Sequence, residues 1–172
     1  LQSMVHRGPD GSGEEIRNGV ALVHTRLAIV DLENGSQPLS DGKAISLVAN
    51  GEIYNDLELR KSFSGVFKTQ SDCESPLILY KELGVDIIKN LRGMWGIAIH
   101  DSDGKILILS RDPFGIKPLY YAETSIGVIF ASEIRAIANT ELLSVDINNH
   151  IRDELLSLQF TTGAETIYRG IN

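Results

Sequence analysis

The chain of 172 residues is 42% hydrophobic and 23% charged, a composition that is typical of a folded domain and excludes a disordered segment. Its 23 acidic and 16 basic residues give a formal charge of -7, which disfavours a surface for nucleic acids or anionic membranes. The single cysteine, Cys73, excludes an internal disulfide framework and favours a reducing, cytoplasmic compartment, and no apolar run is long enough to span a membrane.

Short strands separated by turn residues are predicted along much of the chain. Each predicted strand is a short run that is rich in β-branched and apolar residues. The predicted strands are residues 20–24, 27–30, 45–49, 52–54, 96–100, 105–109, 117–122 and 127–131. The last four are expected to form two antiparallel hairpins, the first of them through the turn Asp101-Ser-Asp-Gly104.

Helices are predicted where apolar residues recur at helical spacing behind a capping residue. The predicted helices are residues 56–62, a run that begins after Ser71 or Asp72 and continues until Gly84, and residues 85–91, 133–137 and 151–158. Asn55 is expected to cap the first helix with Glu58 as its capping-box partner, Ser71 or Asp72 to cap the second, and Ser132 the fourth. Strands and helices together predict an α+β domain in which helices cover antiparallel sheets.

The stretch ISLVANGEIYN, from Ile45 to Asn55, has two interpretations. Asn-Gly between two apolar runs favours a tight type I′ hairpin turn with Asn50 and Gly51 both at positive φ. Alternatively, the Asn50 amide and the unshielded Gly51 N–H form a pair of donors for an oxyanion that develops during acyl transfer. The turn alone does not decide between them.

Three charged residues also carry a structural and a functional interpretation. Arg26 lies between apolar segments, where it either forms an ion pair, with Asp31 as its candidate partner, or holds a substrate carboxylate through two hydrogen bonds. Asp72 is either a helix cap or an acceptor for a ligand ammonium, and Glu52 is either a solvent-facing strand residue or a second acceptor. With Asn50 and Gly51, these residues would suit an α-amino acid that carries a side-chain amide.

Two further motifs are predicted to be structural. HRGPDG, from His6 to Gly11, predicts a rigid loop in which Pro9 fixes one backbone angle and Arg7 forms a salt bridge. RDPFGIKPLYY, from Arg111 to Tyr121, predicts a shaped turn with a buried Asp112–Lys117 pair. The histidines have no spacing that indicates a metal site.

Six motifs follow one another in an order that carries a family resemblance. They are HRGPDGSG, RLAIVDL, NGEIYN, SDCE, LRGMWGIAIHD and SRDPFGIKPLYY. In this order they resemble the type 2 glutamine amidotransferase domain of glutamine-dependent asparagine synthetases, from His6 to about Arg135. The forms HRGPD and NGEIYN are closer to asparagine synthetase than to glucosamine-phosphate synthase or phosphoribosylpyrophosphate amidotransferase.

The resemblance implies an N-terminal nucleophile (Ntn) hydrolase fold, an αββα sandwich of two antiparallel sheets flanked by helices. It implies that Arg26 binds the α-carboxylate of L-glutamine, that Asp72 and Glu52 bind the α-amino group, and that Asn50 and the Gly51 N–H form the oxyanion hole. It also implies a nucleophilic cysteine at the mature N-terminus, which attacks the amide, releases ammonia and leaves a thioester for hydrolysis. Cys73 is mid-chain, lacks the free amine that activates this nucleophile, and is expected to be a small buried side chain.

The sequence is therefore expected to be a fragment: residues 1–165 as an N-terminally truncated glutaminase domain, and residues 166–172 as the start of a connector to a C-terminal synthetase domain. ATP and magnesium are assigned to that absent domain, and no cofactor or metal is expected here. The fragment is expected to be inactive. The expected partners are L-glutamine and the synthetase domain, and a homodimer is left open. Binding to nucleic acid or to a membrane is not expected.

Two alternatives to this function remain. The domain serves an amidotransferase that acts on another carboxylate acceptor, such as a cell-surface sugar, or it is a non-catalytic glutamine-binding or scaffolding module. The first residue of the mature protein distinguishes the module from the enzyme, because only the enzyme requires a cysteine there.

Overall fold

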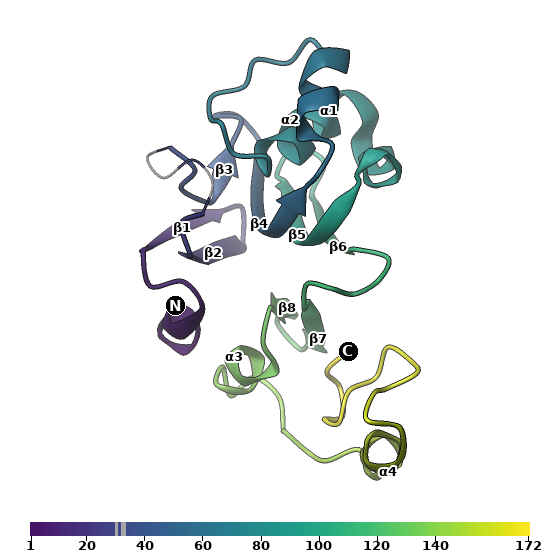
Figure 1. The fold of residues 1–172 in the computed structure, drawn as a ribbon. Helices are drawn as coiled ribbons and strands as arrows, with labels where there is room; N and C mark the ends of the chain where they lie inside the picture. Colours follow the sequence, from purple (N-terminus) through teal and green to yellow (C-terminus); the bar gives the residue numbers. More distant parts are fainter. Residues whose placement is uncertain (30, 32–33) are drawn as a thin grey trace. The chain divides into compact units, whose positions relative to one another are not determined.

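The computed structural model describes residues 1–29, 31 and 34–172 (Figure 1). The chain divides into two compact units, Leu1–Pro118 and Leu119–Asn172. None of the helices in the described residues combines the length and apolar character needed to cross a membrane.

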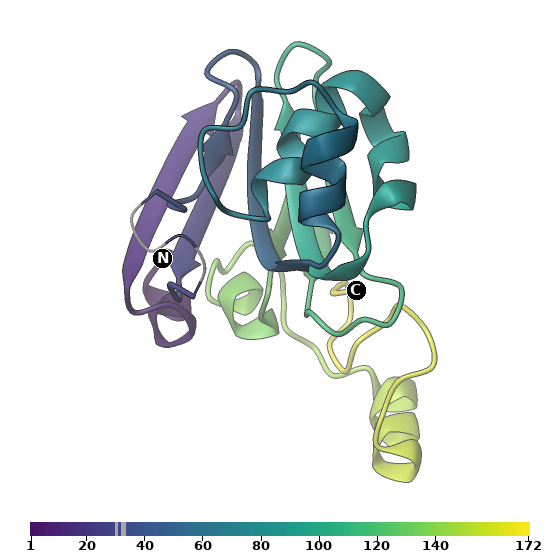
Figure 2. The ribbon, with the colours of Figure 1, turned by 45° about the horizontal axis from the view of Figure 1, so that its top comes forward.

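The first unit contains two antiparallel sheets. β1 (Gly11–Arg17) pairs with β2 (Val20–Arg26), and the second sheet has the order β3 (Leu39–Ser40), β4 (Ile45–Ile53), β5 (Gly93–Asp101), β6 (Ile106–Arg111). The helical segments are η1 (Gln2–Arg7), α1 (Asp56–Ser62), α2 (Glu74–Leu83) and η2 (Gly84–Asn90). In Figure 2, α1 and α2 lie across one face of the strands β4 and β5.

The main core lies between that sheet face and the helices. Leu47, Ile97 and Ile99 of the sheet and Leu79 and Ile87 of the helical layer are completely buried. Side chains alternate across a strand, so the odd-numbered residues of β4 and β5 face the helices and the even-numbered residues face the opposite side. Each such side chain contributes about 1.5–3 kcal/mol through burial. This core fixes the direction of every β4 side chain.

β4 runs without interruption through Asn50 and Gly51, so the predicted hairpin is wrong. Asn50 pairs with Gly96 and Gly51 with Trp95 in the β4–β5 ladder, and neither residue has a positive φ. A Cβ atom on Gly51 would lie 2.3 Å from the Met94 carbonyl oxygen. Glycine is therefore required here by the closeness of β5 and not by a turn.

Of the other predicted strands, some are confirmed and some are not. The strand at 20–24 and the hairpin of 96–100 with 105–109 are confirmed by β2, β5 and β6. Residues 27–29 are not in a strand, and position 30 lies outside the described residues. β1 was missed because GSGEEIR has few apolar residues, and its Glu15 instead accepts a hydrogen bond from the Ser46 hydroxyl of β4.

The helices occur where they were predicted, but their caps differ. Asn55 precedes α1 as expected, yet its side chain donates to the Asn90 carbonyl (2.9 Å) and accepts from the Arg92 N–H (2.8 Å) instead of capping the helix. Cys73 is the N-cap of α2, and it makes no side-chain capping bond. The predicted helix at 85–91 is the 3-10 segment η2.

The Arg111–Tyr121 motif is organised by one buried carboxylate. Asp112 accepts main-chain hydrogen bonds from Trp95 (3.2 Å), Phe114 (3.1 Å), Ile116 (3.0 Å) and Lys117 (3.0 Å). Burial alone would raise the pKa of Asp112, but these donors outweigh it and hold the pKa below its ordinary value. The predicted pair with Lys117 is therefore a hydrogen bond to its main chain and not an ion pair.

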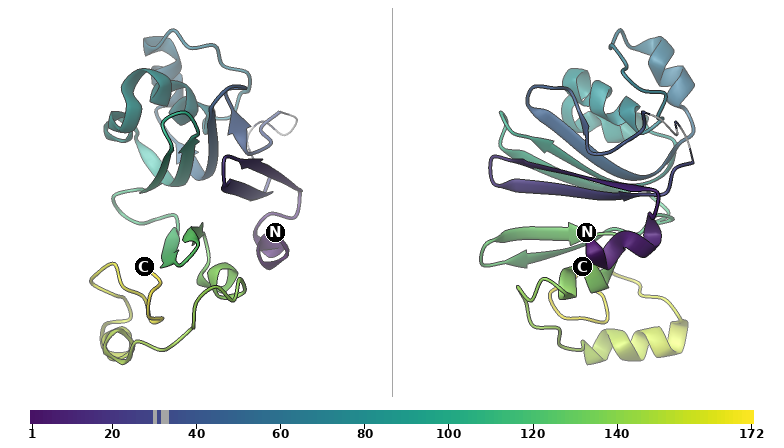
Figure 3. Two further views of the ribbon diagram at one scale, coloured as in Figure 1. Left: turned by 180° about the vertical axis from the view of Figure 1, so that it is seen from behind. Right: turned by 90° about the vertical axis from the view of Figure 1, so that its left-hand side faces the viewer.

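The second unit is a small hairpin with two helices (Figure 3). β7 (Tyr120–Thr124) pairs with β8 (Gly127–Ala131), which confirms the second predicted hairpin, and α3 (Ile134–Ala138) and α4 (Asn149–Leu158) follow. The N-cap of α3 is Glu133 and not Ser132. Residues 166–172 pack within this unit, since Ile171 is buried and Asn172 and Tyr121 exchange two main-chain hydrogen bonds of 2.9 Å.

Candidate active site

The main chain of β4 presents the candidate donor pair at its edge. Alternate residues of an antiparallel strand direct their N–H groups to opposite sides. The Ala49 N–H donates to Gln37 Oε1 (2.6 Å) and the Ile53 N–H to Asp72 Oδ2 (2.5 Å), both away from β5. The N–H of Gly51, midway between them, therefore points to the same edge.

The Asn50 side chain lies on the sheet face opposite the core. Its Nδ2 atom is buried and has no hydrogen-bond partner among the described residues. A buried donor without a partner costs about 1–3 kcal/mol, so native proteins rarely retain one without a reason. Asn50 Nδ2 and the Gly51 N–H are thus two adjacent donors that an oxygen-bearing ligand could satisfy together.

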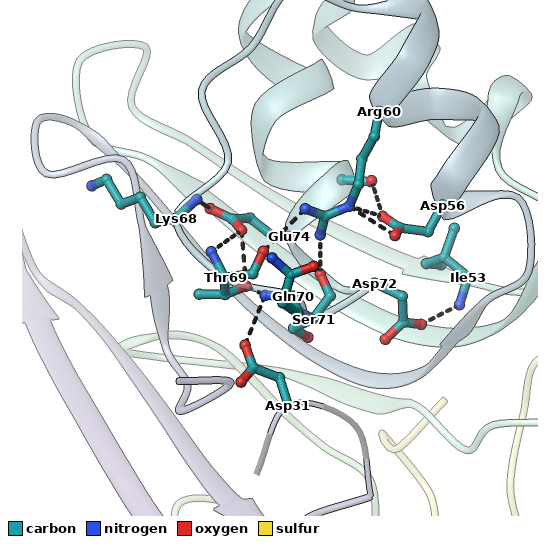
Figure 4. Close-up of polar contacts among 11 residues, drawn as sticks. Asp31, Ile53, Asp56, Arg60, Lys68, Thr69, Gln70, Ser71, Asp72 and Glu74 are labelled. Atoms are coloured by element: carbon teal, nitrogen blue, oxygen red, sulfur yellow. Dashed lines mark hydrogen bonds and ion pairs between the residues drawn. The ribbon is translucent and has the colours of Figure 1, made fainter. Parts of the chain in front are cut away.

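Asp72 is held beside this part of β4 by its bond to the Ile53 N–H (Figure 4). It ends a segment, residues 67–72, which we call the 67–72 loop. Glu52, next to Gly51, has an exposed side chain, as the solvent-facing strand interpretation predicts. Glu52 is therefore the neighbour of Ile53 in β4, and Asp72 accepts a hydrogen bond from the Ile53 N–H.

Arg60 of α1 holds the inner side of the 67–72 loop. Its Nε atom bonds to both carboxylate oxygens of Asp56 (2.9 and 2.8 Å), and its Nη1 and Nη2 atoms donate to the carbonyls of Thr69 (3.0 Å) and Ser71 (2.7 Å). The guanidinium also lies 4.3 Å from the ring centre of Phe67. Arg60 thus donates two hydrogen bonds to the loop that carries Asp72, while Asp56 of α1 holds its third nitrogen (Figure 4).

Glu74, the first residue of α2, holds the other end of the same loop. Its carboxylate accepts hydrogen bonds from the N–H groups of Lys68 (2.8 Å) and Thr69 (2.7 Å) and from the Thr69 hydroxyl (2.8 Å). Glu74 is 2% exposed, so these charge-assisted bonds take the place of the hydrogen bonds that its carboxylate would make to water. A half-buried Arg and a buried Glu therefore hold the loop that ends at Asp72.

Arg26 is the last residue of β2, and its main chain is held by the HRGPDG motif. The Asp10 N–H donates to the Arg26 carbonyl (3.0 Å), and a Cβ atom on Gly8 would lie 2.4 Å from the Arg26 nitrogen. Asp10 itself accepts from the Ala28 N–H (2.9 Å), a structural role as predicted. The Arg26 side chain donates to the main-chain carbonyl of Asp31 through Nη2, so this hydrogen bond engages the main chain of Asp31.

Comparison with known proteins identifies the family. Residues 1–172 match the family described as the glutamine amidotransferase domain. The chain belongs to this family. A probable glutamine-hydrolyzing asparagine synthetase of Schizosaccharomyces pombe is 48% identical over 139 residues, covering 77% of this chain and 25% of its own length. Asparagine synthetase 1 of Bacillus subtilis, also glutamine-hydrolyzing, is 37% identical over 170 residues, covering 96% of this chain and 27% of its own length. This chain thus spans about a quarter of the length of these relatives.

A solved structure confirms the fold class. Glutamine phosphoribosylpyrophosphate amidotransferase from B. subtilis superposes on 86% of this chain and 41% of its own with a TM-score of 0.69, at 22% identity. This likeness supports the α+β fold that was expected from the sequence. The antiparallel sheets and covering helices of the amidotransferase domain agree with it.

Cys73 is unsuited to act as the nucleophile of the amidotransferase domain. Burial raises the pKa of its thiol to about 12, with a further increase from the neighbouring Asp72 carboxylate. The thiolate, which is the reactive form, is therefore absent at neutral pH. The side chain is 5% exposed at the start of α2, and its Sγ atom lies 3.9 Å from the Gly51 carbonyl. This agrees with the expected role as a small buried residue.

His24 is a buried histidine near Arg26 whose surroundings the sequence did not predict. It lies on β2, two residues before Arg26 and on the same side of the strand. Burial lowers its pKa, contact with the Ala49 main chain opposes this, and Arg26 lowers it further. Its Nδ1 atom is buried and has no partner in the described part of the chain. A lone histidine in a strand has no spacing signal, so only the structure places it beside β4.

Two cavities of the domain, of about 400 and 300 Å³, contain none of the five predicted site residues. In the described ranges, no group of three or more His, Cys, Asp or Glu side chains could hold a metal ion.

Proposed function

We propose that this chain is the glutaminase domain of a glutamine-hydrolysing asparagine synthetase, with residues 1–165 as the domain and 166–172 leading into a connector. Its product, ammonia, would serve the ATP-dependent amidation of aspartate in a further domain, where ATP and magnesium would bind. The names of the relatives at 48% and 37% identity support this proposal, as does the share of their length that the chain spans.

L-glutamine would be held by opposite charges at its α-carbon. Arg26 would bind the α-carboxylate with two parallel hydrogen bonds, a geometry that its planar guanidinium favours. Asp72 and Glu52 would accept hydrogen bonds from the α-ammonium. The positions of Asp72 against Ile53 and of Glu52 beside Gly51 support this assignment. The side-chain amide would then extend toward Asn50.

The reaction is an acyl transfer in two steps. A thiolate, which the resemblance assigns to an N-terminal cysteine, would attack the amide carbon, and the resulting oxyanion would accept hydrogen bonds from Asn50 Nδ2 and the Gly51 N–H. Collapse of this intermediate would break the carbon–nitrogen bond and release ammonia, and water would then cleave the thioester to give glutamate. The net change is glutamine plus water to glutamate plus ammonia.

The observation that carries the proposal is the Asn50 amide, which is buried with Nδ2 unpartnered among the described residues and lies beside a glycine N–H that points off the sheet edge. Such a donor pair is costly without a ligand and is suited to an oxyanion.

The test is ammonia release from L-glutamine by the full-length protein that contains this chain. We expect turnover, and we expect Arg26→Lys to raise KM for glutamine by more than about tenfold because a lysine cannot form the paired bonds. A full-length protein that neither binds nor hydrolyses L-glutamine would contradict the proposal. The 172 residues by themselves, whose one cysteine is Cys73, are expected to release no ammonia above buffer.

A further inference from the structure

Asp31 contacts both halves of the proposed amino-acid clamp. Its carbonyl accepts a hydrogen bond from Arg26 Nη2, and its Oδ2 atom accepts one from the Gln70 N–H of the 67–72 loop (2.7 Å; Figure 4). Its Oδ1 atom accepts from the Asn34 N–H (3.1 Å). One residue therefore touches the side chain assigned to the α-carboxylate and the loop that carries Asp72.

The 67–72 loop has supports from α1, from α2 and from β4, the last through the bond between Asp72 and the Ile53 N–H, and the bond to Asp31 adds one from another part of the chain. Arg60 and Glu74 belong to α1 and α2, and they hold the loop against the helical layer. The bond to Asp31 comes instead from the segment that follows β2. Gln70 and Asp72 are two residues apart, so a shift of the loop at Gln70 would also move Asp72.

The ligand makes this spacing critical. The carboxylate and ammonium of an α-amino acid are attached to the same carbon, so the groups that bind them must stand at one fixed separation. Arg26 lies on β2, whereas Asp72 lies on a loop far along the chain. An error of about 1 Å in such a clamp lowers binding or turnover by as much as about a hundredfold.

We propose that Asp31 is a positioning residue that sets the distance between Arg26 and Asp72 and thereby selects for an L-α-amino acid. This inference rests on the proposed function. Asp31 has a positive φ of 48°, a conformation that Asp and Asn tolerate better than most residues. The Gln70 N–H is the main reason that the pKa of Asp31 is below its ordinary value, which agrees with a charged carboxylate at this contact.

The test compares Asp31→Asn with Asp41→Asn in the full-length protein. Asn keeps the positive φ and the main-chain carbonyl at position 31, but it replaces one acceptor oxygen with an amide. Asp41 is a control because its Oδ1 atom also accepts main-chain bonds, from Lys43 (2.8 Å), Ala44 (3.0 Å) and Ile45 (3.0 Å), at the turn between β3 and β4, where its Oδ2 atom pairs with Lys81 (3.2 Å). We expect Asp31→Asn to raise KM for L-glutamine about tenfold with kcat changed less than about twofold. We expect Asp41→Asn to lower Tm and leave KM unchanged.

A double-variant cycle then separates positioning from general stability. If Asp31 acts through the position of Asp72, the effects of Asp31→Asn and Asp72→Asn on KM are less than additive, because the second change removes the carboxylate whose position the first disturbs. An unchanged KM in Asp31→Asn, or fully additive effects, would overturn this inference and leave the proposed function standing. A wild-type protein without glutamine binding would overturn both.

Discussion

At the scale of single residues, two buried side-chain atoms have no hydrogen-bond partner among the described residues, Asn50 Nδ2 and His24 Nδ1. Asn55 shows the ordinary arrangement, since both ends of its buried amide are hydrogen-bonded. The same residue type thus stabilises the fold at 55 and is left available at 50. This contrast allows catalysis and stability to be separated.

We expect Asn50→Ala to lower kcat for glutamine hydrolysis by about 10²–10³, the usual effect of removing one oxyanion donor. Stability should stay equal or rise, because the variant removes an unsatisfied buried donor. Asn55→Ala is the control: it should destabilise by about 1–3 kcal/mol with kcat unchanged, because it leaves the Asn90 carbonyl and the Arg92 N–H without a partner. Steady-state kinetics and urea unfolding measure both effects. An Asn50→Ala variant with full kcat would exclude the oxyanion role.

His24 is expected to make stability depend on pH in a defined window. Burial lowers its folded-state pKa below the ordinary value of 6.5. Well above pH 6.5 His24 is neutral in both the folded and the unfolded protein. As the pH falls below 6.5, the unfolded chain binds the proton first, because its histidine has the higher pKa. The folded protein therefore loses stability until the pH reaches the folded-state pKa. His24→Gln should remove this part of the slope. Urea unfolding of both proteins from about pH 5 to 8 tests this, and parallel curves would show that His24 does not contribute.

The sequence predicted which residue types could bind glutamine, but it did not predict what holds them. Arg26, Asn50 and Asp72 were selected because a guanidinium, an amide and a carboxylate complement the groups of one substrate. The hydrogen bond between the Gln70 N–H and Asp31 joins residues that are 39 positions apart in the sequence, and no periodicity or local motif encodes such a contact. His24 was missed for the same reason.

At the scale of elements, β4 shows how pairing overrides local turn chemistry. Asn-Gly strongly favours a hairpin turn in isolation, yet nine consecutive residues of β4 pair with β5 through that dipeptide. The apolar runs on both sides share one face of the strand, so a continuous strand buries them together. Local hairpins such as β5–β6 and β7–β8 were predicted correctly because turn and strand signals there agree.

We expect Gly51→Ala to destabilise the protein by about 1–3 kcal/mol, because its Cβ would lie 2.3 Å from the Met94 carbonyl oxygen and 2.8 Å from the Trp95 Cα. Both neighbours are main-chain atoms and cannot move aside without distorting the β4–β5 ladder. Gly163→Ala is the control, since nothing lies within 4 Å of its Cβ position; it should be neutral or slightly stabilising. Equal stability of the two variants would contradict the close β4–β5 approach.

At the scale of the whole molecule, binding and folding are linked. A ligand that binds only the folded protein stabilises it by about 2.7 kcal/mol at a concentration of 100 Kd. For a domain of this size, about 1 kcal/mol shifts Tm by roughly 2–4 °C. Saturating L-glutamine is therefore expected to raise Tm by about 5–11 °C in the full-length protein.

The sharpest control is the mirror-image ligand. D-glutamine has the same charges and the same amide, but with its side chain directed toward Asn50 its carboxylate and ammonium exchange places, so Arg26 would meet the ammonium and Asp72 the carboxylate. Like charges would then face each other at both contacts, and the Tm shift should fall below about 1 °C. Arg26→Lys should also reduce the shift with L-glutamine, because it removes the paired bonds to the carboxylate. A D-glutamine shift equal to that of L-glutamine would show that the α-carbon groups are not clamped between Arg26 and Asp72.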